Sequence, residues 1–289
     1  MKRFWVIFRY TLTSLRGQIL GWGLGLALYG LLITSMYDTL QAQQDQFQQM
    51  IANYPEAFLA FFGADANVMM TPAGFLGMYA FSMMPILVGI FAVLTGSGLI
   101  VSDEENGRLD LIIAHPIGRS AFFFGRCSAL FAASFVFHFL GWLGFCLLLR
   151  RSNLGIGWGQ MALPFLSLLV QIWVYAALAL LFSLILPARS LAAMVSGALV
   201  IASYFMSSLA FMHARLETAS KFLPYHYYQT VLTFSEVNLS WLLGLLGISL
   251  IMLAVAWLSF LRRDIRLSGE GSWDLPWEGK KRKLSESTR

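Results

Sequence analysis

The chain has 289 residues, of which 58% are apolar and 12% are charged, and its mean hydropathy is +0.67. Soluble domains carry about 25% charged residues, so this composition excludes an ordinary soluble globular protein. The formal net charge of +5 does not indicate nucleic-acid binding, because the basic residues follow the distribution expected for membrane topology.

The first 18 residues have the pattern of an amphipathic helix. Lys2, Arg9 and Arg16 recur every seven residues and share one helical face. A second face is apolar and carries Phe4, Phe8, Leu12 and Leu15. The pattern predicts an interfacial helix whose cationic side faces anionic headgroups. A plain basic anchor is an alternative that the interfacial helix does not exclude. The first apolar run is too long for the core of a signal peptide, and no small-residue cleavage site follows it, so we expect no cleavable signal peptide.

Six long apolar runs follow, each long enough to cross a bilayer. They cover residues 19–40, 74–101, 121–149, 161–186, 191–212 and 239–261. None alternates apolar and polar residues as the strands of a membrane barrel do. The sequence therefore predicts an all-α integral membrane protein with six transmembrane helices preceded by the interfacial helix.

Small residues at four-residue spacing predict close helix packing in two of these runs. Gly17, Gly21 and Gly25 mark the first run, and the third run carries a second ridge made of Gly125, Ala129 and Ala133. We expect both ridges to pack within the subunit rather than to form a dimer seam.

Other local signals predict a helix start, a bend and packing cysteines. Thr71 precedes Pro72 as a helix cap, and Pro85 should kink the second span. Cys127 and Cys146 lie on one helix about 28 Å apart at 1.5 Å per residue, which no disulfide spans.

The basic residues also predict the orientation of the spans. With the N-terminus in the cytoplasm, 16 of the 20 Lys and Arg residues fall on the cytoplasmic side. An even number of spans then places both termini in the cytoplasm. We expect Asp38 to be solvated at the outer end of the first span, and an outer aromatic belt formed by Tyr225, Tyr227, Tyr228 and Trp241.

The predicted organisation is a single membrane domain. Residues 1–18 form the interfacial helix, residues 19–261 the six-span domain, and residues 262–289 a basic cytoplasmic tail. The six-span domain contains a cytoplasmic segment, 102–120, and two long outside loops, 41–73 and 213–238.

Segment 102–120, SDEENGRLDLIIAHPIGRS, is the most informative part of the chain. Ser102 and Glu105 have the spacing of a capping box, and acidic residues beside it favour a helix N-terminus. Asn106-Gly107 interrupts the chain, a short apolar helix follows over 109–114, and His115-Pro116 ends it. A connector between spans needs no such helix, so we expect this helix to dock on a partner. A tight membrane-surface loop is the alternative.

This segment resembles the signature of permease subunits of type-2 ABC exporters, E-x-G-T-L-D/E-L-L-L-x-x-P-[small]-R. Arg108 replaces the usual threonine and Gly118 the usual serine. The likeness extends to YPEAFLAFFG with TPAGFLGMYAFSMMPIL, to FLPYHYY before the last span, to the ending FLRRDIR and to the N-terminal helix, so it covers nearly the whole chain.

The resemblance implies a coupling helix seated in a groove of a separate ATPase subunit. Its implied coupling residues are Glu104, Glu105, Gly107, Leu109, Asp110, Leu111, His115, Pro116 and Arg119. Such permeases pair as homodimers or heterodimers and bind two copies of an ABC ATP-binding subunit. ATP and Mg would belong to that partner, and this chain would bind no cofactor of its own. The expected location is the inner membrane of a prokaryote, in contact with lipid.

No catalytic motif appears in the chain. It lacks G-x-x-x-x-G-K-[ST], G-x-S-x-G and H-E-x-x-H, and its four histidines show no metal-ligand spacing. We therefore expect a protein that is not an enzyme and that has neither catalytic residues nor a metal site. Polar residues inside spans can mark a substrate path, here His138, Gln171, Tyr175 and Tyr204. Hydrogen bonds between helices are the more ordinary explanation for all four.

These features favour the permease subunit of an ATP-driven exporter of a hydrophobic or amphipathic drug, lipid or peptide. One alternative is an ABC-type subunit that transmits ATP-driven motion to an extracytoplasmic partner. Another is a stand-alone secondary transporter or channel, although no acidic residue lies at the centre of any span, which counts against ion coupling. A membrane-embedded enzyme lacks any supporting motif.

Overall fold

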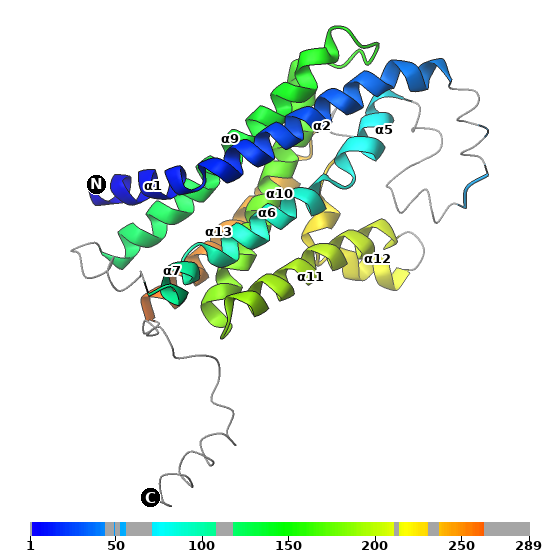
Figure 1. The fold of residues 1–289 in the computed structure, drawn as a ribbon. Helices are drawn as coiled ribbons and strands as arrows, with labels where there is room; N and C mark the ends of the chain where they lie inside the picture. Colours follow the sequence, from blue (N-terminus) through cyan, green and yellow to red (C-terminus); the bar gives the residue numbers. More distant parts are fainter. Residues whose placement is uncertain are drawn as a thin grey trace, which may run out of the picture.

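The computed structural model describes residues 2–43, 49, 53–55, 71–107, 118–210, 214–230 and 237–262. Every regular element in these ranges is a helix (Figure 1). Most of the first predicted outside loop, residues 213 and 231–236 of the second, the tail beyond Arg262 and residues 108–117 of the cytoplasmic segment lie outside the described residues.

The six predicted spans are confirmed as helices long and apolar enough to cross a membrane. They are α2 (Arg16–Ala42), the stretch Pro72–Gly98, α9 (Arg119–Leu149), α10 (Trp158–Ile185), α11 (Arg189–Ser208) and α13 (Leu239–Arg262). Shorter elements are α1 (Lys2–Ser14), α7 (Val101–Glu105), α12 (Ala214–Ser220) and the 3-10 turn η3 (Pro224–Tyr227). The second span consists of α5 (Pro72–Leu76), a π-helical turn η1 (Gly77–Phe81) and α6 (Met84–Gly98). Thr71 caps α5 as predicted, since its hydroxyl accepts a hydrogen bond from the Gly74 amide at 3.0 Å.

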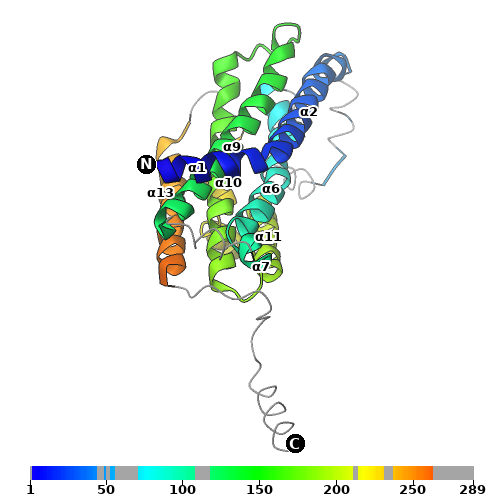
Figure 2. The ribbon, with the colours of Figure 1, turned by 60° about the vertical axis from the view of Figure 1, so that its left-hand side comes forward.

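Helix α10 occupies the centre of the bundle. It packs against α6, α9, α11 and α13, and Figure 2 shows α13 on one side of it and α6 with α11 on the other. Its apolar side chains are therefore mostly buried, whereas α2 and α13 leave long apolar rows exposed. Such rows are expected of helices that face lipid.

Helix α1 leads into α2 with one break at Leu15, and both lie along α9 (Figure 1). Ile7, Thr11 and Leu15 are buried at four-residue spacing, while Arg9 and Arg16 are exposed. The predicted amphipathic helix is thus present, and its buried face packs on α9.

Glycines of α9 allow α1 and α2 to approach α9 closely. A Cβ at Gly144 would lie 2.3 Å from the Cα of Ala27, and a Cβ at Gly125 would lie 3.0 Å from Ile7. Ala129 and Ala133 are fully buried, so the small residues of α9 pack within the subunit as predicted.

The prediction was wrong for the first ridge. Cβ atoms built at Gly17, Gly21 and Gly25 meet nothing within 4 Å among the described residues, so this face of α2 points away from the described bundle. The internal α2–α9 contact uses other glycines instead, Gly23 and Gly30, which pack on Leu140 and Phe145.

Helix α7, the starts of α9 and α11 and the end of α13 lie toward one end of the bundle (Figure 1). We call it the basic end and define it by Arg119, Arg126, Arg189 and Arg262 of these elements, with Arg9 and Arg16 near the junction of α1 and α2. Helix α7 lies at this end, and α12 and η3 lie toward the opposite end (Figure 1).

Candidate functional site

The described part of segment 102–120 begins with α7, which follows α6 after a bend at Leu99 and Ile100. Helix α7 ends at Glu105, and Gly107 adopts a φ of +66°, which confirms the break predicted at Asn106-Gly107. The predicted capping box is wrong, because Ser102 lies inside α7 and Ile100 occupies the cap position without a side-chain bond. Asp103 and Glu104 are buried and Glu105 is exposed.

An ion pair that the sequence did not predict fixes α7 to α9. Arg126 Nη2 donates to Asp103 Oδ2, and Arg126 Nη1 donates to the Leu99 carbonyl at 3.0 Å. The guanidinium also lies 4.9 Å from the ring centroid of Phe122. Asp103 and Arg126 are both less than one-tenth exposed, so the pair is well shielded from water. The only sequence signal for this contact was a pair of opposite charges, an acid inside segment 102–120 and an arginine six residues after it.

The other side of the segment is fixed to α13. Arg119 Nη1 donates to the Leu261 carbonyl at 3.1 Å, and the indole of Trp257 donates to Ser120 Oγ at 3.2 Å. Residues 108–117 therefore connect two anchored ends. Of the predicted coupling residues, Glu104, Glu105, Gly107 and Arg119 lie at those ends, and the five outside the described residues are Leu109, Asp110, Leu111, His115 and Pro116.

Three of the four predicted interior polar residues lie in one network. Gln171 Nε2 donates to the Tyr175 hydroxyl at 2.7 Å within α10, and Ser203 of α11 lies near that hydroxyl. Ser203 in turn accepts from the Tyr225 amide at 2.9 Å, and the Tyr225 ring lies 5.3 Å from that of Tyr204. The Tyr225 amide thus joins η3 to α11 by a hydrogen bond, and Tyr204 adds a ring contact between the same two elements.

His138 lies apart from that network, on α9. Its Nδ1 lies 2.7 Å from the Ser134 carbonyl, and its Nε2 has no protein partner. The ring lies beside an apolar groove of about 340 Å³ between α9 and α10. The structure therefore does not place all four predicted residues on one path.

Two tyrosines from η3 and its C-terminal flank hold the break in the second span. Pro85 has no N–H to bond the carbonyl four residues earlier, Phe81, and the Tyr228 hydroxyl donates to that carbonyl at 3.1 Å instead. The amide of Ile86 donates to the Met83 carbonyl and not to the Ser82 carbonyl four residues earlier. The Ser82 carbonyl accepts instead from the Tyr225 hydroxyl at 2.8 Å. The predicted kink at Pro85 is confirmed as a full break, and the free carbonyls are satisfied as a span in lipid requires.

These bonds correct the predicted aromatic belt. Tyr225 and Tyr228 point into the bundle, and Tyr228 is 7% exposed, so neither serves as an interfacial anchor. Tyr227 and Trp241 lie on the rim of a pocket, with ring centroids 5.5 Å apart. Asp38 is partly exposed, in agreement with the expected solvation, and its carboxylate also accepts from the Asn153 amide at 2.9 Å, which joins α2 to the loop after α9.

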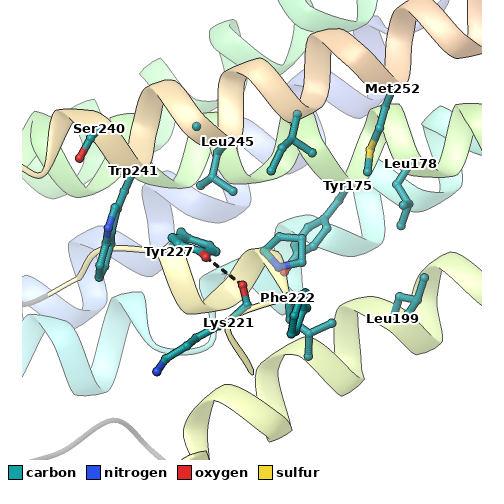
Figure 3. Close-up of a pocket in the computed structure, with 14 residues that line it drawn as sticks. Tyr175, Leu178, Leu199, Lys221, Phe222, Tyr227, Ser240, Trp241, Leu245 and Met252 are labelled. Carbon is teal, nitrogen blue, oxygen red and sulfur yellow. Dashed lines mark hydrogen bonds between the residues drawn. The ribbon is translucent and has the colours of Figure 1, made fainter. Parts of the chain in front are cut away.

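A pocket of about 530 Å³ lies between α10, α11, α13 and η3 (Figure 3). Its wall is mostly apolar and aromatic and includes Tyr175, Leu199, Trp241, Leu245 and Met252. The Lys221 ammonium points away from Tyr175 in Figure 3 and pairs with Glu217 at 2.9 Å. Pockets of this size and lining suit small apolar molecules.

Among the described residues, no group of three or more His, Cys, Asp or Glu side chains is arranged so that it could hold a metal ion. Cys127 and Cys146 are both buried and free.

Comparison with known families identifies the chain. Residues 10–261 match the family model described as "Multidrug efflux system permease Rv1217c, C-terminal domain". The chain belongs to this permease family. No curated protein matches it. The match covers all six spans, so the whole helical bundle described above is the permease domain of this family.

Proposed function

We propose that the chain is the membrane subunit of an ATP-driven ABC exporter of hydrophobic or amphipathic compounds. A separate subunit would hydrolyse ATP and bind Mg, and residues 108–117 would carry the helix that docks on it. Both termini would then lie in the cytoplasm of a prokaryotic cell, with the basic end facing inward.

The observation that carries this proposal is the anchoring of both ends of segment 108–117. Asp103 and Arg126 join its first end to α9, and Arg119 joins its second end to α13. A docking helix can move spans only if force on it reaches them without bending the intervening chain. Membership of an efflux permease family supports the transport role.

The partner is tested by isolating the tagged full-length chain from native membranes in mild detergent and identifying co-purifying proteins by mass spectrometry. We expect an ATPase with a P-loop, lost on Leu111→Pro because proline breaks the docking helix. Glu105→Lys should leave the complex folded but abolish stimulation of ATP hydrolysis. Glu217→Lys, an exposed acid at the opposite end, is the matched control. If no ATPase is recovered in several detergents, a stand-alone channel or carrier becomes the better hypothesis.

The pocket between α10, α11 and α13 is the proposed substrate site. Gly244 lines it, and a Cβ built there meets nothing within 4 Å, so Gly244→Leu fills the pocket without an internal clash. Gly247→Leu on the same helix is equally free of contacts and does not line the pocket. We expect efflux of apolar dyes to fall in the first variant only. Equal efflux in both variants would place the substrate path elsewhere.

A second copy or a paralogous permease would pair with the chain along the exposed face of α2. Gly17, Gly21 and Gly25 form a smooth ridge there that the subunit itself leaves uncovered. Small residues let two membrane helices approach closely enough for dispersion and weak hydrogen bonds to hold them.

A further inference from the structure

A polar cavity of about 240 Å³ lies at the basic end, enclosed by α1, α2, α6, α7, α9 and α11. Its wall carries the hydroxyls of Thr11 and Ser14, the amide of Gln18, and the guanidinium groups of Arg126 and Arg189. Such a wall differs from the two apolar pockets described above. It includes the Asp103–Arg126 pair that anchors the docking segment, but the proposed transport mechanism gives the cavity itself no ligand.

The charged groups of this cavity give it a net charge of +1, from two arginines and Asp103. Asp103 is committed to Arg126 through their ion pair. The Arg189 guanidinium lies over Gly98, because a Cβ built at Gly98 would be 2.7 Å from Arg189 Nη2. Its hydrogen bond to the Leu94 carbonyl is long, at 3.5 Å. Arg189 is also the first residue of α11, whose N-terminal dipole favours an anion.

Two residues of this wall carry a buried donor that has no acceptor among the described residues. Thr11 is 1% exposed and Arg126 is 8% exposed, and the atoms concerned are Thr11 Oγ1 and Arg126 Nε. Buried donors without acceptors are costly, and most are satisfied by a bound molecule or water. Hydroxyl, amide and guanidinium donors around one small cavity fit a group with several acceptor oxygens, such as a phosphate.

The position of the cavity indicates that this phosphate belongs to a lipid. Leu94 lines the cavity and begins an exposed apolar row that continues along α6 with Ile90 and Leu87, which are 54%, 47% and 42% exposed in that order. An acyl chain can follow this row into the membrane while the headgroup stays at the basic end. We propose that the cavity binds the headgroup phosphate of an anionic phospholipid, with Arg189 as its main ligand.

Native mass spectrometry of the delipidated full-length chain tests this site. Phosphatidylglycerol, phosphatidylcholine with the same acyl chains, and inorganic phosphate are added in separate arms. We expect one phosphatidylglycerol per chain, held more tightly than phosphatidylcholine, and no retention of inorganic phosphate. Retention of inorganic phosphate as strong as that of the lipid would overturn the assignment to a membrane source.

Two matched variants distinguish lipid binding in the cavity from nonspecific electrostatic attraction of the lipid to the protein surface. Arg189→Gln should weaken phosphatidylglycerol binding about tenfold, as loss of one charge-assisted hydrogen bond implies. Arg16→Gln removes the same charge from an exposed position at the same end and should leave binding unchanged. An equal loss in both variants would mean that only the overall charge matters, and the proposal would fail.

A second variant covers the case in which Arg189→Gln does not fold. Ser14→Leu fills the exposed rim of the cavity while keeping both arginines. We expect it to lose the bound lipid, and lipid retention at the level of the unmodified chain would overturn the site.

Discussion

At the scale of single residues, the buried pair of Asp103 and Arg126 decides how α7 meets α9. Two charges in a shielded site lose their hydration, and the pair is tolerated because each partner neutralises the other. The Leu99 carbonyl and the Phe122 ring provide further contacts for the guanidinium. Removing one partner therefore leaves a buried charge with no compensation.

Arg126→Met should lower the free energy of unfolding by about 3–5 kcal/mol, as expected for breaking a buried ion pair from one side. The double variant Asp103→Leu with Arg126→Met should recover most of this loss, because no charge then remains buried. Unfolding from mixed micelles by added SDS measures both. A double variant as unstable as Arg126→Met alone would argue against the ion pair as the source of the effect.

The tyrosines at the break in the second span make a second prediction at this scale. Tyr228→Phe removes the hydroxyl that donates to the Phe81 carbonyl and should cost about 1–2 kcal/mol. Tyr227→Phe removes a hydroxyl that bonds the exposed Lys221 carbonyl, which water can replace, so it should be nearly neutral. The same SDS titration compares them, and equal losses would contradict the role of Tyr228.

Features of single residues that depend on their neighbours in the sequence were predictable, and contacts with distant parts of the chain were not. Thr71 and Gly107 were predictable because a cap and a positive φ depend on neighbouring residues. The partners of Asp103, Asp38 and Tyr228 were not, because each lies on another part of the chain, at a separation of 23, 115 and 147 residues. The Ser102 prediction failed because α7 already begins at Val101 as an extension beyond α6.

At the scale of elements, η3 and α12 form a small cap whose stability should depend on pH. Burial lowers the pKa of His226 below its usual value, and Lys221 lowers it further, while Glu217 opposes the shift. Ser220 Oγ lies 3.2 Å from His226 Nδ1, and Trp241 packs beside the ring. The neutral imidazole is therefore the form that suits the folded cap.

Because the folded-state pKa of His226 is lowered, the unfolded cap binds more protons, and the cap loses stability as pH falls below the usual histidine value of about 6.5. Hydrogen exchange of residues 214–230 should accelerate between pH 7 and pH 5 beyond the intrinsic pH trend. His226→Gln should remove that dependence. A pH dependence that persists in the variant would place the titrating group elsewhere.

The elements themselves were largely predictable, because a run of apolar residues long enough to cross a bilayer has almost no alternative to a helix. Pro85 also predicted where the second span bends. The π-helical turn at Gly77–Phe81 was not predicted, and the carbonyls of Phe81 and Ser82 at its C-terminal end accept hydroxyls from another part of the chain.

At the scale of the whole molecule, the uncovered ridge of α2 predicts where two chains meet. Gly21→Leu adds a side chain to open space, so the subunit should fold normally. The added side chain should weaken the dimer by keeping the two helices apart, so the dimer fraction at a given protein concentration should fall. Gly247→Leu adds the same side chain to an open position on α13 and is the control. Cross-linking in membranes measures the dimer fraction, and an unchanged fraction in Gly21→Leu would exclude this face as the seam.

The sequence led us to expect this ridge inside the subunit because the spacing of small residues marks a close approach without naming the partner helix. Gly125 and Gly17 carry the same local pattern, yet one faces Ile7 and the other faces open space. Only the three-dimensional arrangement of the six spans separates these two cases.

The ion pair between Asp103 and Arg126 has a mechanical consequence. It joins two residues that are 23 positions apart and so closes the chain between them into a ring that contains residues 108–117. A force applied to residues 108–117 is therefore transmitted to both α6 and α9. The two helices must then tilt together, and a pull on one of them alone must first open the ring.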